Sequence, residues 1–147
     1  MSSPTNTSSE KDEMRKKAIE KLFEEKSFEP RQLYELADKI SGLATINNEG
    51  DIFIKREGLT IRERVGLIAC ARFLGNQLTE QVSPLVSSHD VVQYLRIELN
   101  SARARLSELV REGMLISPER GSYRARSLPV VSRFIDEMVS KYAQSEE

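Results

Sequence analysis

The sequence predicts a mainly α-helical fold with a few short β-strands, which belongs to the α+β class. Two observations on apolar spacing lead to this prediction. Apolar residues recur at intervals of three and four in several separate stretches, as they do on one face of a helix. In other places short apolar runs lie on both sides of a glycine-containing turn, as in a β-hairpin. The chain has 147 residues, which corresponds to one compact domain or two small ones at roughly 100–200 residues per domain.

Composition excludes several classes of protein. The chain contains one cysteine, Cys70, and one histidine, His89. These counts rule out an internal disulfide, a cysteine-based zinc site and a histidine-rich metal centre. No apolar stretch approaches the ~20 residues that are needed to span a bilayer. The first residues are not followed by the apolar segment that is typical of a secretory signal peptide. We therefore expect a cytoplasmic protein that does not interact with a membrane.

The first part of the chain is rich in polar and charged residues. Ser, Thr, Pro and Asn make up nearly all of residues 1–10, so we expect a disordered tail there. Residues 11–58 are expected to hold helices and a hairpin. Within them, lysine and glutamate dominate residues 11–26, where sparse apolar residues at helical spacing predict a helix with a thin apolar stripe. This helix either packs through that stripe, extends into solvent or contributes to a dimer.

A second helix and a small hairpin complete this N-terminal segment. Pro30 is tolerated in a first helical turn and opens a helix that is expected to end at Gly42. Apolar residues alternate in 44–46 and again in 52–54, on either side of a turn that contains Gly50. This pattern predicts a β-hairpin.

The next domain is expected over residues 59–127 and begins with a capped helix. Thr60 and Glu63 have the spacing of a capping box, in which the hydroxyl and the carboxylate accept hydrogen bonds from backbone N–H groups at a helix start. We expect this helix to reach Leu74 and to stop at Gly75, because glycine commonly follows the last helical residue.

Two closely spaced helices follow in this domain. A short helix is expected over 89–95, with Ser87 or Ser88 as its cap, and the chain then turns tightly at Arg96. A second helix is expected over 98–111. Small and aliphatic residues form one face of this second helix: Ala102, Leu106, Leu109 and Val110.

A hairpin and a last helix end the chain. The hairpin is expected over 114–126 with its turn at 118–121, where proline and glycine are close together. Apolar residues at helical spacing predict a C-terminal helix over 128–143, followed by a tail at 144–147. This helix covers the core of its own domain or pairs with a second copy. We expect a homodimer, formed through it or through the N-terminal helix.

The segment DVVQYLRIELNSARARLSELVREGMLISPERGSYRA, residues 90–125, carries a recognisable pattern. A short helix ends in leucine, a tight pair of residues turns the chain, and a helix follows with a small apolar residue, a leucine four positions on and another three further. A Glu-Gly-aliphatic-aliphatic sequence then leads into the hairpin. With this pattern, the region from Thr60 to Arg126 resembles a winged helix-turn-helix DNA-binding domain. In the turn, Arg96 stands where the family often has a glycine, which tolerates a positive φ.

The resemblance implies that helix 98–111 enters the major groove of DNA and that the hairpin is the wing. Asparagine pairs with adenine and arginine with guanine through two hydrogen bonds each. Residues of the helix that point away from its apolar face are therefore the expected readers of bases, and polar residues of the wing are expected near the phosphate backbone. The candidate nucleic-acid-binding residues are Asn100, Ser101, Arg103 and Arg105 on the helix and Arg120, Tyr123 and Arg124 on the wing.

The distribution of charge agrees with this interpretation. The stretch from His89 to Arg126 contains seven arginines, no lysine and five carboxylates, an excess of two positive charges, whereas the whole chain carries −1. Guanidinium groups suit phosphates and guanine edges better than ammonium groups do. An excess of two is modest, however, since nucleic-acid-binding domains are usually more basic.

These features predict a DNA-binding protein that acts as a transcriptional regulator on double-stranded DNA. The sequence has neither a Gly-x4-Gly-Lys-Ser/Thr loop nor a Gly-x-Gly-x-x-Gly motif, and its adjacent acidic residues point in different directions on helices. We therefore expect neither an enzyme nor a bound cofactor or metal. The alternative function is a winged-helix adaptor that binds other proteins in a larger assembly, through helix 98–111 or the N-terminal helix.

Overall fold

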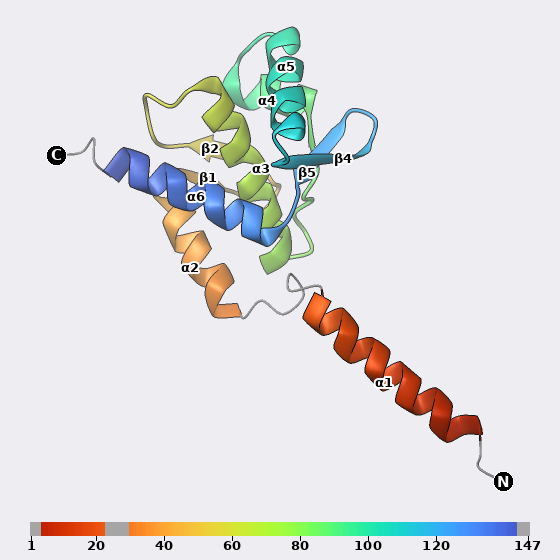
Figure 1. Ribbon diagram of the computed structural model, residues 1–147. Coiled ribbons are helices and arrows are strands. Elements are labelled where there is room, and N and C mark those ends of the chain that lie inside the picture. The colour runs from red at the N-terminus through yellow and green to blue at the C-terminus, as the bar shows by residue number, and fades with distance from the viewer. Residues whose placement is uncertain (1–3, 23–29, 144–147) are drawn as a thin grey trace. The chain divides into compact units, whose positions relative to one another are not determined.

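The computed structural model describes residues 4–22 and 30–143 (Figure 1). These residues contain six helices and two small antiparallel sheets, which confirms the α+β class. The chain divides into two compact units, Met1–Pro30 and Arg31–Glu147. None of the helices in the described ranges combines the length and the apolarity that crossing a bilayer requires.

The described part of the first unit is one helix, α1, Pro4–Leu22. It begins inside the segment 1–10 where we expected a disordered tail, and that expectation is corrected from residue 4 onward. Proline at a first helical position has its φ preset for a helix, and acidic residues stand four positions before lysines along α1, a spacing that favours isolated helices. The expected tails at 1–3 and 144–147 and the end of the expected helix at 23–26 lie outside the described residues.

The second unit begins with the helix and the hairpin predicted from the sequence. Helix α2, Pro30–Ser41, buries Leu36 and Ile40. Strands β1, Ala44–Ile46, and β2, Ile52–Ile54, pair in antiparallel register, with Thr45 opposite Phe53. Gly50 closes the turn with a φ of 89°, a conformation that favours glycine.

Helix α3, Ile61–Leu78, is the centre of the second unit. Thr60 and Glu63 form the predicted capping box, and every residue from Val65 to Gly75 is buried. An eleven-residue stretch buried on all sides of a helix requires neighbours all round it. Both sheets and helices α4, α5 and α6 contact α3.

Two glycines allow the neighbours of α3 to approach closely. A Cβ on Gly75 would lie 3.0 Å from Cγ1 of Val82 and 3.3 Å from Cδ1 of Ile46. The prediction that α3 ends at Gly75 is therefore wrong: this glycine makes room for packing, and the helix continues to Leu78. A Cβ on Gly66 would lie 2.8 Å from Cε2 of Phe134, and closer still to Cζ.

The remaining elements form a second layer beside α3. Ser87 caps the short helix α4, and a capping box with Asp90 completes this helix start. Three strands form a sheet in the order β3-β5-β4. The hairpin turn is tighter than the predicted 118–121, because β4 runs through Pro118 at a bulge, where a strand tolerates proline. The bounds are β3 Val86–Ser87, α4 Ser88–Leu95, α5 Leu99–Arg111, β4 Leu115–Glu119 and β5 Ser122–Ala125.

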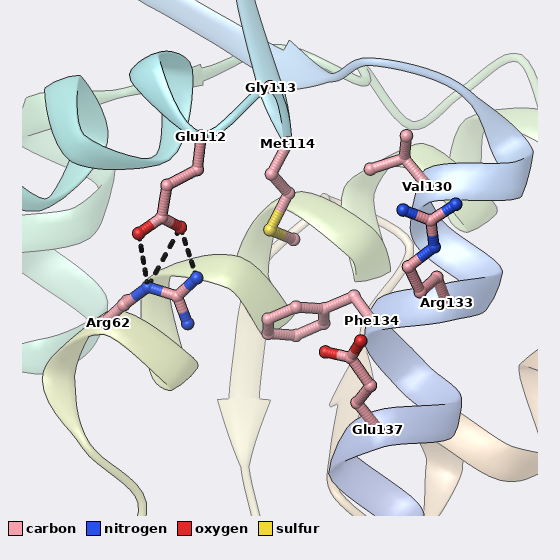
Figure 2. A pocket seen from close by; sticks show the side chains of 8 residues that line it. All are labelled: Arg62, Glu112, Gly113, Met114, Val130, Arg133, Phe134 and Glu137. Carbon is pink, nitrogen blue, oxygen red and sulfur yellow. Dashed lines mark hydrogen bonds and ion pairs between the residues drawn. The ribbon is translucent and has the colours of Figure 1, made fainter.

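The last helix, α6, Leu128–Ala143, has the predicted bounds and covers the core, which is one of its two expected roles. Its apolar stripe is buried within the same chain, with Val131 and Ile135 fully covered. Figure 2 shows Phe134 of α6 and Met114, just before β4, lining one cavity of 210 Å³. The apolar stripe therefore packs on its own domain, and a homodimer through other residues of α6 or through the N-terminal helix stays a prediction.

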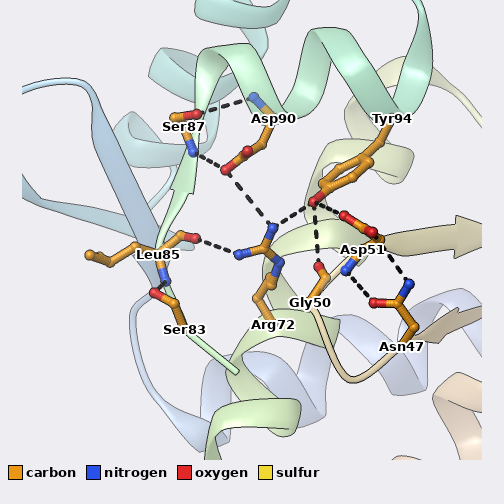
Figure 3. A network of polar contacts seen from close by, with 9 residues as sticks. All are labelled: Asn47, Gly50, Asp51, Arg72, Ser83, Leu85, Ser87, Asp90 and Tyr94. Atoms are coloured by element: carbon orange, nitrogen blue, oxygen red, sulfur yellow. Dashed lines mark hydrogen bonds and ion pairs between the residues drawn. The ribbon is translucent and has the colours of Figure 1, made fainter. Parts of the chain in front are cut away.

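A buried arginine joins the β1–β2 hairpin to α4 (Figure 3). Arg72 of α3 is 8% exposed. Its guanidinium donates to the carbonyl oxygen of Leu85 at 3.1 Å and to the hydroxyl of Tyr94 at 2.6 Å. The Tyr94 hydroxyl lies 3.4 Å from the Gly50 carbonyl oxygen. These contacts fix where α4 lies relative to α3 and the hairpin.

A buried carboxylate holds the end of α6 against the start of α3. Glu63 is 5% exposed and accepts hydrogen bonds from the Tyr142 hydroxyl at 2.5 Å, the Lys141 ammonium at 3.0 Å and the Thr60 N–H at 2.9 Å. Burial favours the neutral acid, but these hydrogen bonds to the charged form outweigh it and lower the pKa of Glu63 from 4.5 to about 2.

We predict that Gly66→Ala lowers the free energy of unfolding by about 1–3 kcal/mol, because the added methyl group overpacks against Phe134. Chemical denaturation monitored by circular dichroism measures the change. Gly42→Ala is the matched control, since its Cβ would meet only the Lys39 carbonyl oxygen, at 3.8 Å. The double variant with Phe134→Leu should recover part of the loss, and equal effects of the two glycine substitutions would contradict the proposed contact.

We predict that the free energy of unfolding falls as the pH is lowered from about 4.5 toward 2, the range between the unfolded and folded pKa of Glu63. A depressed folded pKa stabilises the fold above that range, and protonation removes the stabilisation. The contribution is at most about 3 kcal/mol, at ~1.4 kcal/mol per pKa unit. The free energy of unfolding, measured by chemical denaturation at several pH values in this range, should change less with pH in Glu63→Gln than in the wild type. The same pH dependence in both proteins would refute the assignment.

Candidate nucleic-acid interface

Helix α5 has one buried face and one exposed face, as the sequence predicts. Ala102, Leu106 and Leu109 are fully buried against the core. Asn100 and Arg103 are exposed on the other side. Because α5 packs against both α3 and α4, its polar face is held in a fixed orientation.

The turn before α5 has a left-handed backbone. Arg96 ends α4 with a φ of 55° and a ψ of 47°. It is the single non-glycine residue with positive φ in the described ranges. Glu98 precedes α5 without a side-chain cap. A left-handed conformation costs a residue with a Cβ about 1–2 kcal/mol, so the chain holds this turn despite its local cost.

A cleft of 460 Å³ lies between α5, the start of α4 and the β4–β5 hairpin. It brings together three of the seven candidate residues, from segments far apart in the sequence. Arg103 comes from α5, Arg120 from the hairpin turn and Tyr123 from β5. The complete lining is Ser88, His89, Arg103, Ser107, Arg120, Gly121 and Tyr123.

The electrostatics of this cleft favour an anion. Its lining contains two arginines and no carboxylate. Within the described part of the chain, neither Arg103 nor Arg120 forms an ion pair. Phosphate oxygens are strong acceptors for unpaired guanidinium groups, and hydroxyl groups such as those of Ser107 and Tyr123 add donors.

The carboxylates of α5 are held on its other side. Glu112 receives a two-pronged ion pair from Arg62 of α3 (Figure 2), which raises the pKa of Arg62 above its usual value. Glu108 lies 2.9 Å from the guanidinium of Arg105 and 4.0 Å from that of Arg62. Glu108 and Glu112 are therefore paired within the protein and do not line the cleft.

The other candidate residues lie outside the cleft lining. Asn100 and Ser101 occupy the first turn of α5, with Asn100 exposed and Ser101 half-buried. Arg105 is engaged by Glu108. Arg124 neighbours Tyr123 on β5, so its side chain points to the opposite face of the sheet, and it donates a long hydrogen bond of 3.4 Å to the Ala125 carbonyl oxygen.

Four lining residues were not among the candidates from the sequence. Ser107 stands four positions after Arg103, a helical spacing that places both on one face and was a usable signal. Gly121 forms the hairpin turn with a φ of 82°. Ser88 and His89 reach the cleft from the first turn of α4. No local pattern links that turn to α5, because the tertiary fold alone brings them together.

The described residues form neither a metal site nor an accessible thiol. In the described ranges, no group of three or more His, Cys, Asp or Glu side chains has the arrangement of a metal site. Cys70 is fully buried, which raises the pKa of its thiol and leaves it without access to a substrate. Comparison with models of protein families, with characterised proteins and with solved structures finds no match.

We predict that Arg96→Gly raises the free energy of unfolding by about 1 kcal/mol, because glycine adopts the left-handed conformation without a Cβ clash. Thermal or chemical unfolding measures the change. Arg96→Ala is the matched control, since it removes the same charge and keeps the Cβ. A gain of the same size in the alanine variant would show that the charge, and not the backbone, is the cause.

Proposed function

We propose that the chain is a winged helix-turn-helix protein that binds double-stranded DNA and acts as a transcriptional regulator. In this proposal α5 enters the major groove, and the β4–β5 hairpin is the wing. Asn100 and Arg103 read base edges, and Arg120 contacts a phosphate.

The order of the elements supports the proposed fold. From α3 onward the chain runs helix, strand, helix, helix, strand, strand, and the central strand of the sheet is β5. The first strand pairs with the hairpin next to the start of α4, with Val86 opposite Tyr123. This pairing holds the wing beside the exposed face of α5, as a reading head of this kind requires.

The cleft between α5 and the wing is the observation that carries the proposed function. It has two unpaired guanidinium groups, several hydroxyl groups and no carboxylate. A strand of duplex DNA presents a phosphate chain beside the groove that a helix enters. With Arg120 on its hairpin wall, the cleft suits a sugar-phosphate strand, while Arg103 on its α5 wall reaches the adjacent bases.

We predict that the protein retards duplex DNA in a mobility-shift assay and that the affinity falls steeply with salt, with a slope of about −0.9 per phosphate contact. Arg103→Ala should relax the preference at one base pair, a loss of about 1–3 kcal/mol there. Arg120→Ala should weaken binding to all sequences alike and reduce the salt slope by about 1.

Arg133→Ala is the control for these variants, because Arg133 is an exposed arginine on α6 and its loss changes the net charge by the same amount. It should leave DNA binding unchanged. Equal losses in all three variants would mean that binding follows net charge and not the α5–wing cleft. A wild-type protein that fails to retard DNA at low salt would favour the winged-helix adaptor instead.

A further inference from the structure

The single histidine of the chain lies in the α5–wing cleft. His89 lines this cleft together with Arg103, Arg120 and Tyr123. It stands in the first turn of α4 and is exposed. Arg103 comes from α5 and Arg120 from the hairpin turn, so three separate segments place a basic side chain at one opening. The imidazole of His89 is therefore accessible to a ligand that enters the cleft.

The charged groups around His89 within the cleft are all cationic. Arg103 and Arg120 form no ion pair in the described ranges. Tyr123 of β5 and Ser107 of α5 contribute hydroxyl groups, and no carboxylate is among the lining residues. A protonated imidazole at His89 would therefore be a further positive charge in the cleft, with no acidic partner in the lining.

The acidic residue that follows His89 in the sequence is engaged on the core side of α4. The carboxylate of Asp90 accepts the Ser87 N–H at 3.0 Å, as part of the capping box, and lies 4.0 Å from the guanidinium of Arg72. Figure 3 shows the Asp90 side chain directed toward Arg72, and Asp90 does not line the cleft. Among the described residues, His89 has no ion-pair partner.

Histidine differs from the two arginines in that its charge depends on pH. An unperturbed histidine changes charge between about pH 5 and 8, whereas arginine stays protonated in proteins. Both ring N–H groups of an imidazolium donate hydrogen bonds, and such charge-assisted bonds to phosphate oxygens are strong. An anion in the cleft therefore binds the protonated form more tightly than the neutral form. By thermodynamic reciprocity, binding of the anion then favours uptake of a proton.

We propose that His89 is a third phosphate-binding side chain of the α5–wing cleft, and that its protonated form strengthens the binding of double-stranded DNA. This inference rests on the proposed DNA-binding function and adds a pH dependence to it. Affinity rises as the pH falls from about 8 to about 5, because the imidazole gains a positive charge and the ligand is an anion. Glu63, with a pKa of about 2, keeps its negative charge over this range, so its contribution to the stability of the fold stays constant.

The test uses the full chain without a histidine tag and a duplex DNA of random sequence. Mobility shifts are measured at about pH 5.5 and about pH 8, near the two ends of the histidine range. The wild type should bind about fivefold more tightly at the lower pH, the size of one contact between unit charges ~4 Å apart in water. Its salt slope should also be steeper there by about 0.9, as for one additional phosphate contact. Calorimetry in two buffers of different ionisation enthalpy should show proton uptake on binding.

Substitutions separate the charge of His89 from its shape and from the rest of the cleft. His89→Gln keeps a hydrogen-bonding side chain without a charge, so its affinity should be the same at both pH values. His89→Lys is cationic throughout and should bind at both pH values as tightly as the wild type does at the lower one. Arg103→Ala loses a different contact of the cleft and should bind more weakly while it keeps the pH dependence.

The outcomes distinguish this inference from the proposed function. DNA binding with the same affinity and salt slope at both pH values would overturn the role of His89 and leave the proposed DNA binding intact. A pH dependence that persists in His89→Gln would assign it to another group and overturn the role of His89 as well. Failure to retard DNA at either pH in low salt would overturn both proposals. Circular dichroism at the two pH values checks that each variant is folded.

Discussion

The burial of α3 on all sides is the constraint on which the second unit depends. A helix with no exposed stripe from Val65 to Gly75 cannot be stable until neighbours cover every side of it. The hairpin, the three-stranded sheet and the helices α4, α5 and α6 supply that cover. Gly66 sets how closely α6 approaches α3, and Gly75 sets how closely β1 approaches it. The distances between the surface elements therefore follow from the packing of one helix.

Arg72 holds α4 in place against the core, next to the α5–wing cleft. Its guanidinium is buried in α3, with its Nε atom unpaired among the described residues. Leaving a buried donor unpaired costs free energy, and the hydrogen bonds to Leu85 and Tyr94 offset that cost. Because the first turn of α4 lines the α5–wing cleft and Tyr94 belongs to the same helix, this arginine helps to fix the position of that cleft on the core.

The arrangement of charge explains how a nearly neutral chain can offer an anion site. The acidic residues of α5 pair with Arg62 and Arg105, and Glu63 is sequestered beneath the end of α6. Arg103 and Arg120 are left without such partners in the described ranges. Net charge therefore says little about this surface, since the field that a ligand meets depends on which charges are already paired.

The sequence by itself determined the kinds and order of most elements of the second unit, because these depend on local signals; strand β3 was not among the predicted elements. The capping box at Thr60, the hairpin turn at Gly50 and the apolar face of α5 are all readable within a few residues. Only the tertiary structure decided that α3 passes through Gly75, that the α6 stripe is covered, and that His89 and Arg103 line one cleft. These outcomes depend on contacts between distant segments, whose side chains compete for the same space in ways that local spacing does not record.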